Sequence, residues 1–266
     1  MSQTEIPRIG LGTWQNTDSK KCVESVIHAL ESGYRHIDTA QFYGNEDFVG
    51  KGIKQSSVPR DEIFLGTKVW INSLSPEKVK ESTEESLERL QLDYIDVLYV
   101  HWPAGEYEPR STLTAFEELV EEGIVRNIGV SNFTPDLLDE ALKHTEKEII
   151  ANQVEMHPWL QQEEMRKYLQ NHNMKLVAYS PLARGAIMEN ETLREIADKH
   201  NVTPAQISLA WLLSYDVVHP IPKATSERHI KENYEVLDIQ LDQADIDAIE
   251  GIETRKRLIS PSFAPF

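Results

Sequence analysis

The chain has 266 residues, 40% of them hydrophobic, and a formal net charge of −17. This length suits one α/β barrel with a full core, so we expect a single domain over residues 1–266. The acidic balance disfavours nucleic acid, whose phosphates need Lys and Arg, and no apolar run is long enough to cross a bilayer.

Eight apolar, β-prone runs alternate with helix-like segments along the whole chain. The predicted strands are residues 9–13, 35–39, 63–69, 95–101, 127–131, 152–156, 176–180 and 217–222. They are rich in Val, Ile and aromatic residues, and several are apolar throughout, as buried parallel strands are. This alternation predicts the α/β class and, within it, a (β/α)8 TIM barrel.

Several helix boundaries carry clear signals. A capping hydroxyl precedes a proline at Ser75-Pro76, Thr134-Pro135 and Thr203-Pro204. Gln206 also completes a capping box with Thr203. Helices are further predicted near 18–32 and 243–252, the second lying beyond the eighth strand–helix unit. Residues 253–266 show little periodicity, so we expect a tail or loop there.

Reactive side chains stand at the ends of three neighbouring predicted strands. Asp38, Lys68 and His101 end these strands, and Tyr43 follows the first of them in a loop. All parallel strands of a barrel end at one mouth, so these groups can converge there. A lysine at the end of a buried strand needs an acidic partner, which Asp38 supplies, and a purely structural ion pair is the alternative.

Tyr43 changes the interpretation of that pair. A phenol beside an ammonium group ionises more easily, which makes it a useful acid or base. His101 can then donate a hydrogen bond to a substrate oxygen or share in the proton transfer. Its alternative role is that of a packed histidine in front of Trp102.

Seven segments closely resemble motifs of the aldo-keto reductase family. They are Gly33-Tyr-Arg-His-Ile-Asp38-Thr-Ala-Gln-Phe-Tyr43-Gly-Asn-Glu46, Thr67-Lys68-Val-Trp70, Val100-His101-Trp102-Pro103, Gly129-Val-Ser131-Asn132-Phe133, Asn152-Gln153-Val-Glu155-Met-His157-Pro158, Tyr179-Ser180-Pro181-Leu182 and Ile221-Pro222-Lys223. The resemblance runs from about residue 6 to 250 in the family's order and spacing. The short loop 104–110 and the short tail are similar to those of compact microbial members, such as 2,5-diketo-gluconate and aldehyde reductases.

The resemblance implies a (β/α)8 barrel that binds NADPH without a Rossmann domain and reduces aldehydes or ketones to alcohols by hydride transfer. Tyr43 would be the general acid that protonates the carbonyl oxygen. Lys68 would lower the pKa of Tyr43, and Asp38 would orient Lys68. His101 would position the carbonyl group of a small-molecule substrate.

The same resemblance implies contacts with the cofactor and the substrate. The nicotinamide would stack on Tyr179, and Ser131, Asn132 and Gln153 would hold its carboxamide. The other predicted cofactor residues, along the pyrophosphate, the ribose phosphate and the adenine, are Thr13, Ser180, Leu182, Lys223, His229, Glu232 and Asn233. The predicted substrate residues are Trp14, Trp70, His101 and Trp102, with core packing as the alternative role of each tryptophan.

One segment departs from the family pattern. Many relatives place an arginine where this chain has His229, and here the arginine, Arg228, comes one position earlier. Lys223 favours NADPH because a ribose phosphate needs a cation. The displaced arginine would weaken this preference or admit NADH.

Other features of the sequence concern the cellular location, metal binding and surface charge of the protein. The first seven residues lack a basic head and an apolar stretch, so no signal peptide is expected, and the one cysteine, Cys22, fits a reducing cytoplasm. No His or Cys spacing indicates a metal site. Acidic residues in the helical segments 84–88 and 117–122 indicate a solvated surface, and adaptation to high salt is the second hypothesis. Arg255-Lys-Arg257 forms a basic cluster that either faces anionic substrates or is solvated.

Three interpretations of function stay open at this point. The first is an NADPH-dependent carbonyl reductase that acts as a monomer, since one chain supplies the whole barrel mouth. The second is a regulatory protein that holds the cofactor on the same barrel without turnover. The third is an unrelated barrel lyase that forms a Schiff base through Lys68.

Overall fold

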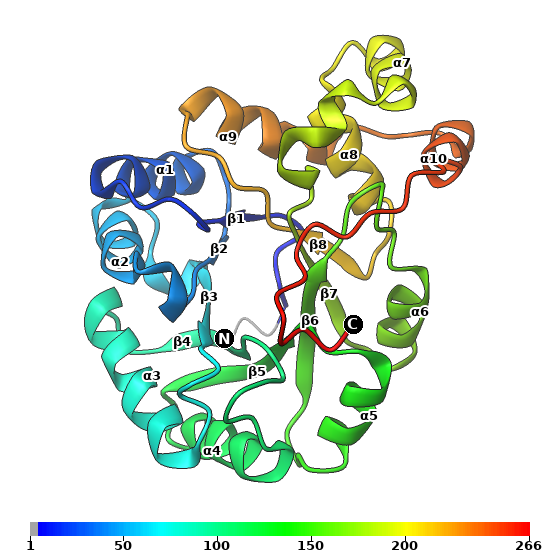
Figure 1. The fold of residues 1–266 in the computed structure, drawn as a ribbon. Coiled ribbons are helices and arrows are strands. Elements are labelled where there is room, and N and C mark those ends of the chain that lie inside the picture. The colour runs from blue at the N-terminus through cyan, green and yellow to red at the C-terminus, as the bar shows by residue number, and fades with distance from the viewer. Residues whose placement is uncertain (1–4) are drawn as a thin grey trace.

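Eight parallel strands lie side by side in chain order and curve into a barrel (Figure 1). The computed structural model describes residues 5–266. The expectation that the first seven residues are not a signal peptide therefore lies largely outside the described residues. The strands are β1 (Gly10–Gly12), β2 (His36–Asp38), β3 (Phe64–Val69), β4 (Ile95–Val100), β5 (Val125–Ser131), β6 (Ile149–Glu155), β7 (Lys175–Tyr179) and β8 (Val218–Pro220). The predicted (β/α)8 barrel is therefore confirmed.

The barrel closes where β1 approaches the segment after β8. The amide of Gly12 donates to the carbonyl oxygen of Pro222 at 3.1 Å. A Cβ atom at Gly12 would lie only 2.6 Å from the carbonyl oxygen of Ile221, and one at Gly10 would lie 2.9 Å from the Ile221 side chain. Gly12 therefore allows two backbones to meet, and Gly10 leaves room for the side chains of His36 and Ile221. This explains a Gly-x-Gly sequence that is not part of a dinucleotide-binding fingerprint.

Helices surround the strands on the outside of the barrel (Figure 1). They are α1 (Ser19–Glu31), α2 (Glu46–Gln55), α3 (Pro76–Leu90), α4 (Pro109–Glu121), α5 (Pro135–Leu142), α6 (Glu163–Asn171), α7 (Glu191–His200), α8 (Pro204–Leu213), α9 (Glu227–Tyr234) and α10 (Gln243–Glu250). Four short 3-10 helices are η1 (Gln41–Tyr43), η2 (Arg60–Glu62), η3 (Ala183–Glu189) and η4 (Glu235–Asp238). Among residues 5–266, no helix is both long and apolar enough to span a membrane.

The capping signals place the helix starts correctly. The Thr134 side chain accepts from the amide of Leu137, and the box formed by Thr203 and Gln206 is complete. Ser75 precedes α3 as predicted, although its side chain makes no capping hydrogen bond. β6 begins three residues before its predicted start, because Ile149 pairs with β5 across an irregularity of register.

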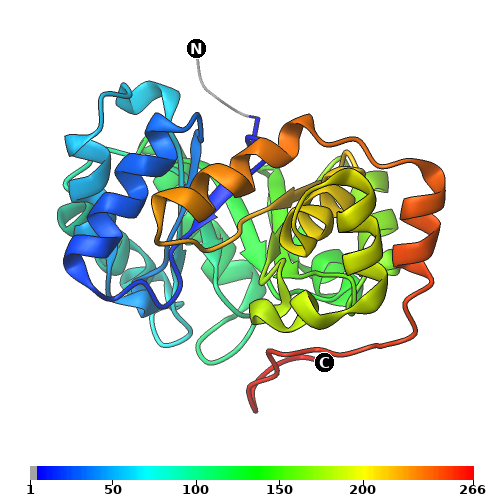
Figure 2. The ribbon, with the colours of Figure 1, turned by 90° about the horizontal axis from the view of Figure 1, so that it is seen from above.

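Apolar side chains fill the barrel and the space between strands and helices. The smaller of two buried clusters lies among the strands and contains Ile6, Phe64, Val97, Tyr99, Ala151, Val177 and Ile221. The larger cluster joins the strands to the surrounding helices. Residues 253–266 form neither helix nor strand, as predicted, and this tail passes across one end of the barrel (Figures 1 and 2).

Candidate active site

The strand ends and the tail enclose a cavity of about 780 Å³. Of the predicted site residues, those that line it are Trp14, Asp38, Tyr43, Trp70, His101, Trp102, Ser131, Asn132, Gln153, Tyr179, Ser180, Leu182 and Lys223. Lys68 does not line the cavity but is buried and contacts Asp38, which does. A cavity of this size with an apolar wall and a few convergent polar groups is typical of a small-molecule site.

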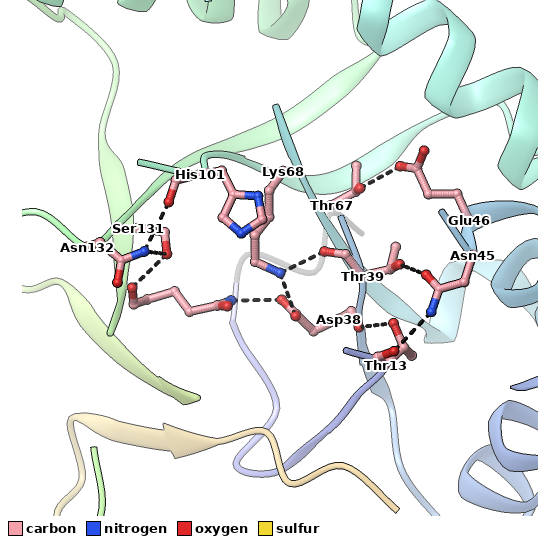
Figure 3. A network of polar contacts seen from close by, with 11 residues as sticks. Thr13, Asp38, Thr39, Asn45, Glu46, Thr67, Lys68, His101, Ser131 and Asn132 are labelled. Atoms are coloured by element: carbon pink, nitrogen blue, oxygen red, sulfur yellow. Dashed lines mark hydrogen bonds and ion pairs between the residues drawn. The ribbon is translucent and has the colours of Figure 1, made fainter. Parts of the chain in front are cut away.

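A buried ion pair forms the base of the site (Figure 3). Nζ of Lys68 lies 2.6 Å from Oδ1 of Asp38 and donates to the carbonyl oxygen of Thr39 at 2.7 Å. The other carboxylate oxygen of Asp38 accepts from Nε2 of Gln153 at 2.7 Å. Burial raises the pKa of Asp38 and lowers the pKa of Lys68, and the opposite charge of the partner works against both shifts. Burial alone makes either charge costly, so each depends on its partner.

Further buried polar side chains support this pair (Figure 3). The hydroxyl of Thr39 donates to Asn45, whose amide in turn donates to the carbonyl oxygen of Thr13 at 2.9 Å. On the other side, the hydroxyl of Thr67 donates to the Glu46 carboxylate at 2.6 Å. The backbone positions around the ion pair are therefore held by hydrogen bonds on either side.

Tyr43 lies on η1, next to the ion pair. The Lys68 ammonium group lies 4.9 Å from the centroid of the Tyr43 ring. The pKa of Tyr43 is nevertheless well above its ordinary value of 10.0, first because the phenol is buried and then because the charge of Asp38 disfavours a phenolate. The net shift is upward because burial dominates, and the lowering of this pKa by Lys68 stays a prediction for this pocket. The phenol keeps its proton there, as a proton donor must.

His101 lies at the end of β4, between Tyr43 and an aromatic wall. Its ring centroid is 5.8 Å from that of Tyr43 and 5.0 Å from that of Trp70. Burial, followed by the charge of Lys68, brings the pKa of His101 well below 6.5, so the imidazole is neutral. A neutral imidazole carries one N–H donor, which suits a hydrogen bond to a carbonyl oxygen.

A chain of hydrogen bonds links the ends of β5, β6 and β7. The Tyr179 hydroxyl donates to Oδ1 of Asn132 at 2.8 Å. Nδ2 of Asn132 donates to Oγ of Ser131 and to the carbonyl oxygen of His101, both at 3.0 Å. The Ser131 hydroxyl donates to the carbonyl oxygen of Gln153 at 2.8 Å. One face of the cavity thus presents an aromatic ring beside fixed amide groups.

Aromatic rings form another wall. The Phe42 ring stacks on Trp70 at a centroid distance of 4.0 Å and on Trp14 at 5.8 Å. The Phe263 ring, from the tail, stands edge-on to Trp102 at 5.5 Å and to Trp70 at 6.1 Å. Sequence reasoning did not identify Phe42 or Phe263. The position of Phe42 next to Tyr43 is a signal that was available, whereas nothing local marks Phe263.

Four predicted cofactor residues do not line the cavity. Thr13 is buried, and its hydroxyl donates to the carbonyl oxygen of Asp38 at 2.9 Å. The other three lie on α9 and are His229, Glu232 and Asn233, of which His229 is exposed and Asn233 is buried. Glu232 pairs with Arg228 at 2.7 Å.

Two cations line the mouth of the cavity. Lys223 lies in the segment after β8 and is exposed. Arg184, on η3, lines the same cavity and was not identified from the sequence. Neither forms an ion pair within the described part of the chain. Among residues 5–266 there is also no group of three or more His, Cys, Asp or Glu side chains that could hold a metal ion.

A (β/α)8 barrel with a cavity of polar and aromatic side chains at its strand ends has the arrangement of a barrel enzyme. The model of the aldo/keto reductase family matches residues 8–254, and the chain belongs to that family. The predicted family membership is therefore confirmed.

Relatives and solved structures cover nearly the whole chain. It is 44% identical over 254 residues to the glyoxal reductase of Bacillus subtilis (strain 168), which covers 96% of this chain and 91% of the relative. It is 41% identical to the methylglyoxal reductase DkgB of Escherichia coli O157:H7, with 96% of each chain covered. The crystal structure of MGS-M4, an aldo-keto reductase enzyme from a Medee basin deep-sea metagenome library, is 41% identical, with a TM-score of 0.92 over 96% of this chain and 94% of that one. The aldose reductase from Schistosoma japonicum is 31% identical, with a TM-score of 0.93 over 98% and 95%.

Proposed function

We propose that this protein is an NADPH-dependent reductase that converts small aldehydes and ketones to alcohols. One observation carries the proposal: a protonated phenol, Tyr43, lies between the buried Lys68–Asp38 pair and a neutral His101 at the wall of one cavity. NADPH would supply the hydride when bound. The protein has to donate a proton to the carbonyl oxygen. It also has to stabilise the negative charge that is left on the proton donor.

Tyr43 is the proton donor in this proposal. Its phenol transfers a proton to the carbonyl oxygen as the carbon–hydrogen bond forms, which leaves a phenolate that takes up a proton from solvent later. The ammonium group of Lys68 stabilises that phenolate by its charge, and Asp38 keeps the ammonium in place. His101 donates a hydrogen bond to the same oxygen and fixes its position.

The remaining pocket residues fit a nicotinamide cofactor with phosphate groups. Tyr179 offers a flat ring surface beside the amides of Asn132 and Gln153. Lys223 and Arg184 are cations at the mouth of a protein with a net charge of −17, where phosphates would lie. Lys223 favours NADPH, and NADH is the second candidate because Arg228 is occupied by an acidic neighbour.

The proposal extends to the substrates, the oligomeric state and the cellular location of the protein. The relatives named as glyoxal and methylglyoxal reductases make small dicarbonyls the first substrates to try. The strand ends and the tail of one barrel build the cavity walls, so no second subunit is needed to complete them, and a monomer is the proposed state. The one cysteine, Cys22, is free and buried, which is consistent with a reducing cytoplasm.

The test follows the ultraviolet absorbance of the reduced cofactor during incubation with glyoxal, methylglyoxal and benzaldehyde. NADPH and NADH are compared at equal concentration, with Tyr43→Phe as the matched control. Oxidation of NADPH that requires both a carbonyl compound and the Tyr43 hydroxyl supports the proposal. Cofactor binding without turnover of any of these carbonyl compounds contradicts it and favours a regulatory protein.

A further inference from the structure

The tail, residues 253–266, forms part of the cavity wall although it has no regular secondary structure. Its residues Leu258, Ile259, Ser260, Pro261 and Phe263 line the cavity. In Figure 2 the tail leaves α10 and runs along one end of the barrel before it doubles back. A segment of this kind needs specific contacts to hold one conformation against its entropy.

The main contact is made by a buried carboxylate. Glu155 ends β6 and is fully buried. Its Oε1 accepts from the amide of Leu258 at 2.7 Å, and its Oε2 accepts from the amide of Ile259 at 2.9 Å. Nε2 of His157 lies 2.8 Å from Oε1. Two consecutive tail amides are thus bound by the two oxygens of one side chain.

Removal of this carboxylate from water is costly unless hydrogen bonds replace the lost hydration. Of the three hydrogen bonds to the Glu155 carboxylate among residues 5–266, two come from backbone amides of the tail and one from the His157 ring. The barrel alone would therefore leave the charge undersatisfied, and hydrogen bonds to an ionised acceptor are stronger than neutral ones. Glu155 and the tail stabilise each other.

The anchor, formed by Glu155 and the amides of Leu258 and Ile259, lies close to the aromatic wall. Phe263 follows Ile259 by four residues and contacts both Trp70 and Trp102. Further on, the guanidinium of Arg257 lies 3.6 Å from the centroid of the Phe266 ring, so the end of the tail returns to its anchored part. A shift of residues 258 and 259 would therefore move the Phe263 ring relative to the substrate space.

We propose that Glu155, supported by His157, is a positioning residue that fastens the tail over the pocket and thereby sets the affinity for substrates that contact Phe263. Glu155 does not line the cavity, so it acts through the tail. The kinetic part of this inference rests on the proposed reductase function. The attachment of the tail does not, and it is tested separately.

Limited proteolysis tests the attachment. The tail contains three consecutive trypsin sites, Arg255, Lys256 and Arg257, next to the anchored amides. Glu155→Gln replaces one acceptor with an N–H₂ donor and removes the charge, so cleavage at these sites should be at least about ten-fold faster, because cleavage follows the population of the open state. Glu163→Gln, at an exposed position at the start of α6, is the control and should behave as the original chain does.

Global unfolding must be separated from local release. If Glu155→Gln lowers the melting temperature and all trypsin sites become sensitive together, or if cleavage at 255–257 does not change, the proposal is overturned. Leu258→Pro removes one donor from the tail and alters no barrel residue, so it tests the same contact if Glu155→Gln does not fold. It should give the same selective cleavage after Arg255 and Lys256, since trypsin does not cut an Arg–Pro bond such as 257–258 would become, and unchanged cleavage after those two residues would equally contradict the proposal.

Kinetics with NADPH and benzaldehyde test the consequence for the pocket. Glu155→Gln should raise KM about ten-fold and leave kcat within about three-fold, because it alters binding and not the proton donor. Phe263→Ala should also raise KM, and adding Glu155→Gln to it should change KM by less than about two-fold, since the two residues act through one contact. Independent, multiplicative effects would overturn the proposed route. Absence of turnover in the original chain would refute the reductase function and leave the proteolysis result to decide the anchor.

Discussion

Nζ of Lys68 lies 2.6 Å from Oδ1 of Asp38, and both side chains are almost completely buried. Removal of one partner leaves the other charge without compensation in the barrel. We expect Lys68→Met to lower the free energy of unfolding by roughly 3–5 kcal/mol. The double variant Asp38→Asn with Lys68→Met should recover part of that loss, because neither charge of the pair is then left buried without its partner.

Urea unfolding of the single and double variants measures this coupling. Lys20→Met is a suitable control, since Lys20 forms only an exposed pair with Glu24. If the two single changes and the double change add without coupling, the pair does not have the energetic role that we assign to it.

The Tyr43 hydroxyl is predicted to be indispensable for turnover. Tyr43→Phe keeps the ring beside Lys68 and removes only the proton donor. General acid catalysis contributes about 10²–10⁴-fold, so kcat should fall by that factor. Quenching of tryptophan fluorescence by NADPH should persist, because Trp14 and Trp70 remain at the pocket. A variant with turnover near that of the original chain would show that another group donates the proton.

Acid should destabilise the fold through its buried neutral histidines. Burial lowers the pKa of His36 from 6.5 to about 3 and that of His219 to about 4. Below pH 6.5 the unfolded chain takes up these protons and the folded chain does not, so stability is present above that pH and falls as the pH drops toward the folded values. Each such histidine contributes up to about 1.4 kcal/mol per pH unit in this window.

Chemical unfolding at a series of pH values between about 4 and 6.5 measures how the free energy of unfolding changes with pH. His219→Gln should make the slope shallower by about one proton, because it removes one of the groups that titrate only in the unfolded chain. Gln170→Asn, a change at an exposed position without a titratable group, is the control and should leave the slope unchanged. An equal slope for all three proteins would contradict the assignment.

Much of this architecture can be predicted from short segments of the sequence. Helix starts such as Thr203 with Gln206 follow from spacing alone, and the strand alternation leads to a barrel whose strand ends share one mouth. The structure accordingly brings Asp38, Tyr43 and His101 to one cavity, as predicted. The raised pKa of Tyr43 was not foreseen, because the sequence shows a neighbouring charge but not the cost of burial.

What the sequence did not reveal depends on contacts between distant segments. The tail carries no periodic pattern, and its place is set by Glu155, about a hundred residues earlier in the chain. Phe263 becomes a pocket residue only through that contact. Phe42 precedes Tyr43 in the sequence, but that position alone does not separate a stacked pocket ring from a surface ring.

Phe42 should affect the choice among substrates. Its side chain is 51% exposed although it is stacked between two tryptophans, so a bound apolar group can cover it. Phe42→Ala should raise KM for benzaldehyde about ten-fold, as the loss of an aromatic contact and its buried area would do. KM for methylglyoxal should change little, because so small a substrate need not reach the wall. Equal effects on both substrates would indicate a general disturbance of the neighbouring Tyr43.

Lys223 should determine the preference between the two nicotinamide cofactors. It is an exposed cation at the cavity mouth without an ion-pair partner among residues 5–266, whereas Arg228 is held by Glu232. A charge-assisted hydrogen bond to a ribose phosphate is worth about 1.5–3 kcal/mol, so Lys223→Met should raise KM for NADPH by roughly ten-fold or more. KM for NADH, which has no such phosphate, should stay within about two-fold. Steady-state kinetics with both cofactors at low and moderate salt measure the ratio, with Lys231→Met on the exposed part of α9 as the control. If Lys223→Met weakens both cofactors equally, Lys223 contacts a part that they share, and the preference must come from another residue such as Arg184.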